Sequence, residues 1–278
     1  MPELPEVETI RRSLLFLEGE TICEVEVHRP KSIRGLSAEE FARKLEGRKL
    51  LELARRGKYL LWHFEGHLTM VIHLRMTGQL LWYLKDHPPD KHTAACWRFH
   101  NLKGQLRLVD MRTFATIDLV PTGSYGSISG LYNLGPEILS QEFSCSTIYE
   151  KLQKRRSSVK SALLDQRLFA GVGNIYADEA LFRAKLNPLT PANQLTEADC
   201  QKLIAHLRAV LEDAIANHGT TFRNYVDGRG ESGGFQNKLS VYGRKGEECP
   251  SCGTPIQRIV VVGRGSFFCP SCQGGEGS

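Results

Sequence analysis

The chain has 278 residues, of which 41% are hydrophobic and 24% are charged, and its formal net charge is +5. The length predicts about two domains, and the composition is typical of globular rather than disordered proteins. No apolar run reaches the ~18 residues of a membrane-spanning helix. The acidic, proline-rich start, Met-Pro-Glu-Leu-Pro-Glu, is unlike a signal peptide, so we expect a cytoplasmic protein without membrane partners. The net charge alone does not identify a polyanionic partner.

The first hundred residues predict one helix followed by a β-rich domain. Apolar residues recur at helical spacing from Val7 to Leu17, after Pro5 and before a possible stop at Gly19. From residue 21 to about 119 the apolar period changes to two, and many short strands of this kind predict a sandwich or barrel. The clearest strand-like runs are 23–27, 51–53, 59–64, 68–74, 79–84, 97–99 and 106–109.

The second half of the chain reads as helical. A stretch with four glycines and three serines, 121–135, predicts a linker. Helices are expected over 148–152, 159–168, 176–182 and 198–216, followed by a loop with four glycines at 227–234. The predicted fold class is therefore α+β and multidomain. Its expected parts are a β-sandwich domain with the N-terminal helix (1–120), a linker (121–135), a helical domain with the glycine-rich loop (136–240) and a cysteine-rich domain (241–278).

Eight cysteines occur in the chain, and four of them form two Cys-Pro-Ser-Cys pairs separated by 16 residues. Each pair can present two thiolates from one tight turn, so the two pairs predict a tetrahedral, structural Zn²⁺ site in a zinc ribbon. The alternative is two redox-active or disulfide-bonded pairs. The predicted zinc ligands are Cys249, Cys252, Cys269 and Cys272, and a hairpin between the pairs carries Arg264 between two glycines, where it could approach a phosphate closely.

Pro2 directly follows Met1, and removal of Met1 would expose a secondary amine. An α-amino group has a pKa near 7.7–8.0, so part of it is neutral and nucleophilic at pH 7. Attack of this amine on a sugar C1′ would give an iminium ion that accepts electrons during elimination. Glu3 and Glu6 could transfer protons beside it. The simpler interpretation is that the acidic hexapeptide only begins the helix.

The motifs along the whole chain resemble those of the bacterial formamidopyrimidine-DNA glycosylases, repair enzymes that remove oxidised purines. The resemblance implies a β-sandwich, a helix–two-turns–helix domain and a zinc ribbon. Besides the start of the chain and the four cysteines, it is carried by Arg-Gly-Lys-Tyr-Leu at 56–60, His-Leu-Arg-Met-Thr-Gly at 73–78, Asp-Met-Arg-Thr-Phe at 110–114, Gly-Val-Gly-Asn-Ile-Tyr-Ala-Asp-Glu at 171–179 and Val-Tyr-Gly-Arg at 241–244.

The resemblance also implies roles for single residues. Pro2 would be the nucleophile at C1′, and Glu3 the acid that assists ring opening, with Glu6 as a second acid. Lys58 would contact a phosphate and assist β-elimination, and Arg264 would hold a phosphate and assist δ-elimination. The target nucleotide must be flipped out of the duplex, because its C1′ is inaccessible in the stack.

Two further groups of residues would serve DNA binding. Phe114 would wedge between bases, Arg112 would hydrogen-bond the orphaned cytosine, and Met76 would fill the vacated space; the Asp-x-Arg-x-Phe spacing places the first two on one side of an extended segment. The glycine-rich loop would cap the lesion. The expected phosphate contacts are His92, Lys154, Arg155, Lys160 and Asn174, the last in a Gly-x-Gly turn that opens a helix.

The resemblance predicts a bifunctional DNA glycosylase/AP lyase for 8-oxoguanine and formamidopyrimidines, acting as a monomer on duplex DNA in the bacterial cytoplasm and nucleoid. Two departures, Ala94 and Ala115, are expected near the DNA surface. One alternative is an endonuclease VIII-like enzyme for oxidised pyrimidines, which usually has Gly after Met-Pro-Glu and lacks the Arg112 and Phe114 pair. The other is a catalytically inactive protein that binds damaged DNA.

Overall fold

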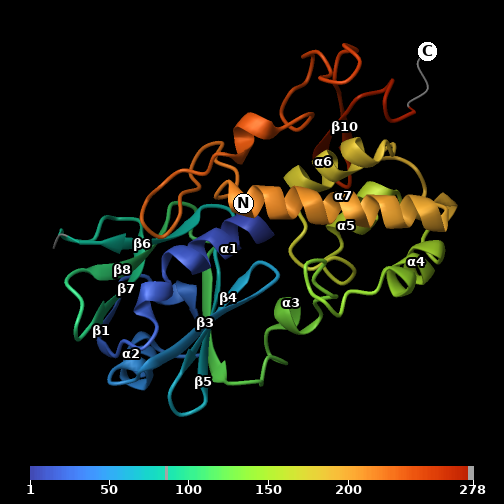
Figure 1. Ribbon diagram of the computed structural model, residues 1–278. Coiled ribbons are helices and arrows are strands. Elements are labelled where there is room, and N and C mark those ends of the chain that lie inside the picture. Colours follow the sequence, from blue (N-terminus) through green and yellow to red (C-terminus); the bar gives the residue numbers. More distant parts are fainter. Residues whose placement is uncertain (85–86, 275–278) are drawn as a thin grey trace. The chain divides into compact units, whose positions relative to one another are not determined.

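The computed structural model describes residues 1–84 and 87–274 and divides into two compact units (Figure 1). The first unit comprises Met1–Tyr132 together with Asn217–Gln236, and the remaining residues form the second. The glycine-rich loop therefore belongs to the N-terminal unit, whereas the sequence placed it with the helical domain. No helix of the described residues has the length and apolar character needed to cross a bilayer.

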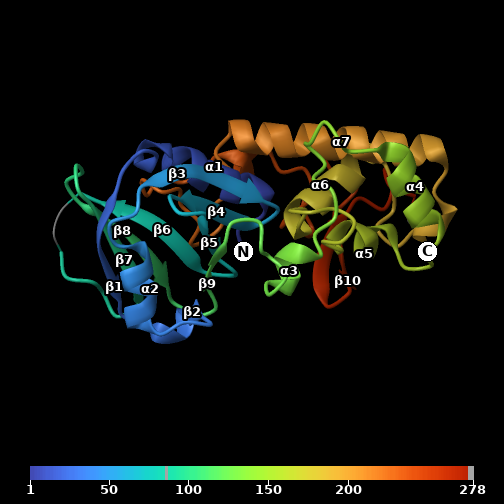
Figure 2. The ribbon, with the colours of Figure 1, turned by 90° about the horizontal axis from the view of Figure 1, so that it is seen from below.

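The first unit is a sandwich of two sheets (Figure 2), one of the two architectures that the alternating pattern predicted and the one that the family resemblance implied. One sheet has the order β1-β7-β8-β6 and is antiparallel throughout. The other has the order β2-β9-β5-β4-β3, in which only β2 and β9 pair in parallel. The strands are β1 (Ile22–Val27), β2 (Ile33–Arg34), β3 (Leu50–Arg56), β4 (Tyr59–Phe64), β5 (Leu68–His73), β6 (Gly78–Tyr83), β7 (Thr93–Phe99), β8 (Gln105–Asp110) and β9 (Thr116–Pro121).

The sandwich core includes apolar side chains of both sheets and of two helices, with Trp62 of β4 and Trp97 of β7 among its largest members. Helix α1 (Leu4–Ser13) contributes Val7 and Ile10 to this core and contacts β3 and β4. Helix α2 (Ala38–Leu45) lies within the stretch that was expected to be all strand. Its signal was a capping box, in which the Ser37 and Glu40 side chains each accept the other's backbone N–H.

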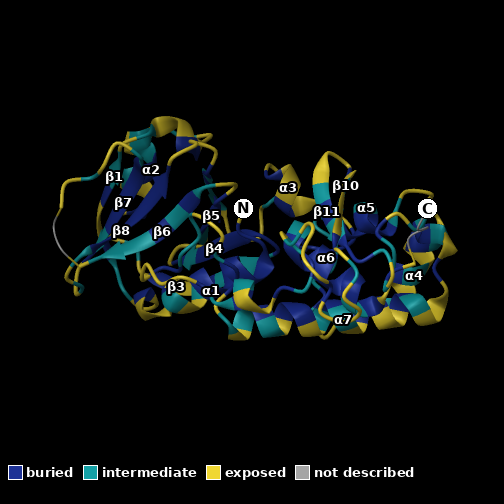
Figure 3. Ribbon diagram, turned by 90° about the horizontal axis from the view of Figure 1, so that it is seen from above, coloured by how far each residue is buried: buried dark blue, intermediate teal, exposed yellow. Residues whose placement is uncertain are grey.

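The second unit contains four helices of six or more residues among its described residues, α4 (Cys145–Gln153), α5 (Val159–Leu164), α6 (Asn174–Ala184) and α7 (Glu197–Ala216). Buried and exposed patches alternate along α7, as its amphipathic pattern predicted (Figure 3). Helix α6 differs, because nearly all of its side chains are buried against α5, α7 and β11. The predicted helix over 159–168 ends at Leu164. The short helix α3 (Ser129–Tyr132), in the first unit, interrupts the predicted linker.

Near the end of the chain, β10 (Gln257–Val261) and β11 (Arg264–Phe268) pair antiparallel and form the predicted hairpin. The hairpin belongs to the second unit, where β11 contacts α6. The four clustered cysteines and this hairpin form the zinc ribbon, so the α+β fold class with its sandwich, helical part and ribbon is confirmed.

Candidate active site and zinc centre

The start of the chain places two carboxylates inside the first unit. Pro2, Glu3 and Glu6 are all buried, and Glu3 is only 3% exposed at the residue that precedes α1. The Glu3 backbone N–H donates to Glu6 Oε2 over 2.8 Å, so the first turn of the helix holds the backbone next to Pro2. Once Met1 is removed, this arrangement would place an amine directly before a carboxyl group that can transfer protons.

Glu6 also fixes the segment that leads into the glycine-rich loop. Its Oε1 accepts the backbone N–H of Thr220 over 2.8 Å. A Cβ at Gly219, where φ is +77°, would lie 2.9 Å from the same carboxylate oxygen, so only glycine fits without strain. The Tyr225 hydroxyl donates to the backbone oxygens of Glu6 and His218. The segment after residue 217 is thus anchored on the N-terminal helix.

The loop itself lies against α1 and the edge strand β6. The Gln79 side chain donates to the Asn224 carbonyl, and the Trp82 backbone N–H donates to the Gly228 carbonyl over 2.8 Å. The Gly228 N–H in turn donates to Ser13 Oγ. A Cβ at Gly228 would lie 2.6 Å from Leu14 side-chain atoms, so this glycine permits the close approach. These contacts place the loop within the N-terminal unit.

Lys58 follows Gly57 in the turn between β3 and β4, and it is only 6% exposed. The next residue, Tyr59, packs edge-on against His73, with ring centroids 4.5 Å apart. Burial, together with the positive charges of Arg75 and Lys58, lowers the pKa of His73 to about 3. His73 is therefore neutral at physiological pH, and the positive charges near it belong to Arg75 and Lys58.

The three predicted void-filling residues are exposed in the first unit. Met76 is 45% exposed and Phe114 is 50% exposed. The Arg112 guanidinium lies 5.0 Å from the centre of the Phe114 ring. The segment is a turn rather than the expected extended run, since Thr113 has φ +60°. The turn nevertheless brings the Arg112 and Phe114 side chains together.

His92 and the two departures from the family pattern lie close to this turn in the fold. The His92 carbonyl accepts the backbone N–H of Asp110, and its side chain is partly exposed. Ala94 and Ala115, in contrast, are 0% and 2% exposed in the sandwich core. Their small side chains fill core positions beside the turn that carries Arg112 and Phe114. Whether they lie near bound DNA stays a prediction.

The basic run at 151–160, in the second unit, contains both exposed side chains and side chains that form ion pairs. Lys154 is exposed, and Arg155 is partly exposed and pairs with Asp165 over 2.9 Å. The Lys160 side chain is fully buried, and its Nζ donates to Asp178 Oδ1 over 2.7 Å and to the Asn174 carbonyl. The prediction that Lys160 contacts a phosphate was therefore wrong, because its ammonium is enclosed within the unit. Spacing alone could not distinguish it from its exposed neighbours.

Asp178 and Glu179 were not singled out from the sequence, although both are buried and fix the C-terminal ribbon. Asp178 accepts the Phe267 backbone N–H in addition to the Lys160 ammonium. Burial raises the pKa of Asp178 to about 6 while Lys160 opposes the rise, so the carboxylate is ionised at neutral pH. Glu179 accepts three backbone N–H groups from residues 240–242. The available signal was two adjacent acids within an otherwise apolar helix.

Asn174 and Arg264 belong to two elements that are joined by a hydrogen bond. Asn174 begins α6 after Gly173, and its Nδ2 donates to the Gly265 carbonyl over 2.8 Å. Its Oδ1 is buried without a hydrogen-bond partner among the described residues. Arg264 follows the tight turn of the hairpin and is exposed. This hydrogen bond places the backbone next to Arg264 at the N-terminus of α6, and the N-terminus of a helix is a favourable place for a phosphate.

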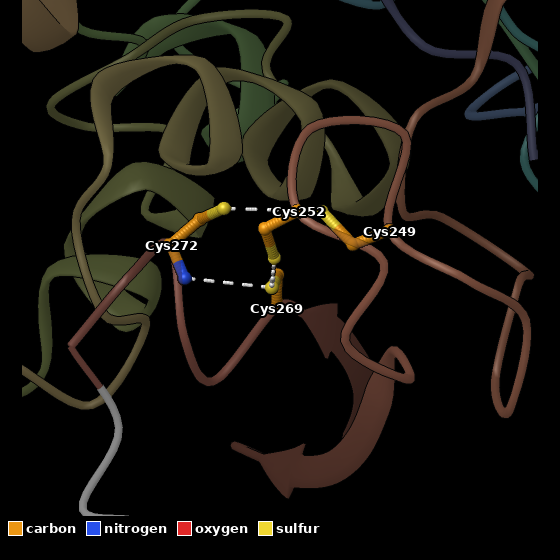
Figure 4. A group of neighbouring side chains, drawn as sticks. All are labelled: Cys249, Cys252, Cys269 and Cys272. Carbon is orange, nitrogen blue, oxygen red and sulfur yellow. Dashed lines mark hydrogen bonds between the residues drawn. The ribbon is translucent and has the colours of Figure 1, made fainter.

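The four predicted zinc ligands converge from two turns (Figure 4). Their sulfur atoms all lie within 4.8 Å of one another, with 3.8 Å between the Cys249 and Cys272 sulfurs and 3.5 Å between those of Cys252 and Cys269. A tetrahedral site with zinc–sulfur bonds of about 2.3 Å requires about 3.8 Å between sulfurs. The donor set therefore fits one structural Zn²⁺, and with four protein ligands it leaves no open position for catalysis.

Comparisons with known proteins identify the same family for the N-terminal and helical parts of the chain and a zinc finger near its end. Family models match the formamidopyrimidine-DNA glycosylase N-terminal domain at residues 1–117, the H2TH domain of the same enzymes at 134–226, and a zinc finger found in FPG and IleRS at 246–274. The formamidopyrimidine-DNA glycosylase of Desulforamulus reducens is 48% identical over 98% of this chain and 99% of its own. That of Bacillus subtilis is 46% identical over the same shares.

Solved structures show the same fold. The MutM (Fpg) protein of Thermus thermophilus is 44% identical, with a TM-score of 0.89 over 98% of this chain and 99% of its own. An Fpg mutant of Lactococcus lactis, solved with a Fapy-dG containing DNA, is 38% identical, with a TM-score of 0.91 over the same shares. From the motifs, the fold and these matches, the chain belongs to the formamidopyrimidine-DNA glycosylase family of base-excision repair enzymes.

Proposed function

We propose that the protein excises 8-oxoguanine and formamidopyrimidines from duplex DNA and then cleaves the strand, with Pro2 as the nucleophile. The observation that carries this proposal is the buried Pro2–Glu3 start, in the same compact unit as an exposed Arg112–Phe114 turn. The first feature supplies an amine and an acid, and the second supplies side chains that can enter a duplex. An inactive DNA-binding protein would need only the second.

The first chemical step uses the nitrogen of Pro2 once Met1 has been removed. With an α-amino pKa near 7.7–8.0, roughly a tenth to a fifth of this amine is neutral at pH 7. Its lone pair forms a bond to C1′ of the flipped nucleotide, the bond from C1′ to the base breaks, and the base leaves with the proton that the proline nitrogen loses. Glu3 donates the proton that opens the sugar ring. The product is an iminium ion that links Pro2 to the opened sugar.

The iminium ion then accepts electrons during strand cleavage. Loss of a C2′ proton allows the C3′–O bond to break, and the 3′ phosphate leaves; a second elimination releases the 5′ phosphate. Lys58 favours the first departure by placing its positive charge near the phosphate, and Arg264 binds the phosphate in the second. Glu6 acts as the second acid, while its hydrogen bonds to Glu3 and Thr220 keep the helix start in place.

Access to C1′ requires a flipped nucleotide, and unstacking costs a few kcal/mol. Phe114 wedges between bases, Arg112 hydrogen-bonds the orphaned cytosine, and Met76 occupies the vacated space. Their exposure on turns of the sandwich is what such a role needs, because side chains inserted into the duplex offset the cost. The glycine-rich loop at 227–234 covers the flipped base. The Lactococcus lactis relative solved with a Fapy-dG containing DNA supports this substrate class.

Phosphate groups bind residues of both units. In the second unit, the proposed phosphate contacts are Lys154, Arg155 and Asn174, which lie at or near the surface, whereas Lys160 is buried in its pair with Asp178 and contacts no phosphate. In the first, His92 contributes from beside the Arg112 turn. The zinc ribbon holds Arg264 in its hairpin. We propose that the protein works as a monomer in the bacterial cytoplasm, on nucleoid DNA.

Borohydride trapping tests the proposal directly. The protein is incubated with duplexes that contain 8-oxoguanine opposite cytosine or thymine glycol opposite adenine, and borohydride reduces any iminium ion to a stable adduct. We expect adduct formation with the first duplex and its loss in Pro2→Gly. A strong preference for thymine glycol would assign the protein to the endonuclease VIII-like enzymes, and no adduct with either duplex would leave only the DNA-binding alternative.

A further inference from the structure

Asp110, the last residue of β8, is a buried carboxylate at the base of the turn that carries Arg112 and Phe114, and it is 1% exposed. Its Oδ1 accepts the Thr77 hydroxyl over 2.5 Å and the Arg112 backbone N–H over 3.2 Å. Its Oδ2 accepts the backbone N–H groups of Phe114 and Ala115 over 2.6 and 2.7 Å. Each carboxylate oxygen therefore accepts two hydrogen bonds, which its two lone pairs allow.

The turn would not keep this shape by itself. Thr113 has φ +60°, a left-handed conformation that is strained for a β-branched residue and that such residues rarely adopt. The residues before and after Thr113, Arg112 and Phe114, both donate their backbone N–H groups to the Asp110 carboxylate. The carboxylate therefore counteracts the strain and selects one conformation of the turn.

The same carboxylate joins this turn to the neighbouring one. Thr77 follows Met76, and its hydroxyl both donates to Asp110 and accepts the Arg112 N–H over 3.2 Å. All of these residues lie in the first unit, where β6 and β8 are paired neighbours and Gly78 pairs with Asp110. A change at Asp110 would consequently loosen the turns of Met76, Arg112 and Phe114 together.

We propose that Asp110 is a positioning residue for recognition of the base opposite the lesion, because its carboxylate fixes Met76, Arg112 and Phe114 in the arrangement that enters the duplex. This inference rests on the proposed function. Asp110 touches no reacting atom in this account. The Asp110 carboxylate orders the turn before DNA binds, so binding does not incur that entropic cost. The Arg112 side chain is then already oriented toward the orphaned base.

The testing variant is Asp110→Asn, which keeps the size of the side chain but replaces one acceptor oxygen by an N–H₂ donor facing N–H groups. Asp118→Asn is the matched control, since Asp118 is in the same unit but pairs with Arg34 instead. Single-turnover excision of 8-oxoguanine is measured opposite cytosine and opposite adenine, and trapping is measured on a preformed abasic site opposite cytosine. Thermal melting verifies that each variant is folded.

We expect Asp110→Asn to reduce the preference for cytosine over adenine about tenfold, as the loss of one oriented base contact would do. Trapping at the abasic site should stay within about threefold of the unmodified protein, and Asp118→Asn should leave both quantities unchanged. A merely structural role for Asp110 would lower both activities without changing the preference. An unchanged preference in folded Asp110→Asn would overturn the inference.

If Asp110→Asn does not fold, Thr77→Val provides the second test, because it removes a single donor to the carboxylate and is nearly isosteric. A reduced cytosine preference would support the inference, and an unchanged one would overturn it. Failure of the proposed function would be recognised separately, since the unmodified protein would then neither excise 8-oxoguanine nor form an adduct at the abasic site.

Discussion

Replacing Lys160 by methionine tests whether this residue forms a buried ion pair, as the structure shows, or contacts a phosphate, as its position in a basic run suggested. The Lys160 and Asp178 side chains are both 0% exposed, and their charged atoms are 2.7 Å apart. Lys160→Met would leave the Asp178 carboxylate buried with the Phe267 N–H but without its cation. The structure therefore predicts a loss of stability, whereas a surface phosphate contact would predict a loss of DNA affinity.

The magnitude follows from the burial. Removing one partner of a buried ion pair typically costs about 3–5 kcal/mol, because the remaining charge stays desolvated. For a protein of this size each kcal/mol lowers the melting temperature by about 2–4 °C, so the expected decrease is about 6–20 °C. Adding Asp178→Asn should recover part of this loss, since it removes the charge while the amide oxygen can still accept the Phe267 N–H.

The assay combines thermal melting of the zinc-loaded protein with the salt dependence of duplex binding. Lys154→Ala is the matched control from the same basic run, because Lys154 is exposed. If Lys154 contacts a phosphate, this variant should reduce the slope of log affinity against log salt by about 0.9, with little change in melting temperature. A Lys160→Met protein that melts normally but shows the reduced salt slope would refute our assignment of a buried ion pair.

Three further outcomes are expected. Chelation of zinc should unfold the ribbon, seen as loss of dispersed amide NMR signals from residues 249–272; retention of those signals in metal-free protein would contradict a structural zinc. Arg112→Ala should weaken discrimination between cytosine and adenine opposite the lesion in excision assays, and equal discrimination would exclude its proposed contact. Although burial raises the pKa of Glu8, hydrogen bonds from Arg11 and Arg12 lower it to about 2 overall. The stabilisation that this carboxylate gives should thus be present above about pH 4.5 and lost as the pH falls from about 4.5 to 2. Glu8→Gln should therefore flatten this part of a plot of the urea midpoint against pH. An unchanged plot would refute the contribution assigned to Glu8.

Much of this fold could be predicted because its signals are local. The two Cys-Pro-Ser-Cys pairs lie in turns whose geometry is set within a few residues, and the four sulfurs converge as expected. The strands 59–64, 68–74 and 79–84 were predicted to within one residue at each end, because short, largely apolar runs bounded by turn residues are typical of strands. The start of α7 is also fixed locally, because Thr196 and Asp199 exchange hydrogen bonds between side chain and backbone.

What could not be predicted depends on contacts between distant parts of the chain. Lys160 belongs to a basic run in sequence, but Asp178, 18 residues later, encloses it. The loop after residue 217 follows a helix of the second unit, yet Glu6 and Ser13 anchor it in the first. The sequence does not indicate that Asp110 accepts hydrogen bonds from four donors, because a turn or strand pairing places each donor near it. Periodicity indicates whether a residue faces a core, but not which polar partner it meets there.

The most direct test of the central claim is to locate the covalent bond. After borohydride trapping on an 8-oxoguanine duplex, the adduct is digested and its DNA-linked peptide is sequenced by mass spectrometry. We predict that the peptide begins at Pro2, lacks Met1, and carries the sugar remnant on the proline nitrogen. A remnant on a lysine, above all on Lys58, or an adduct formed by a protein that retains Met1, would contradict the account.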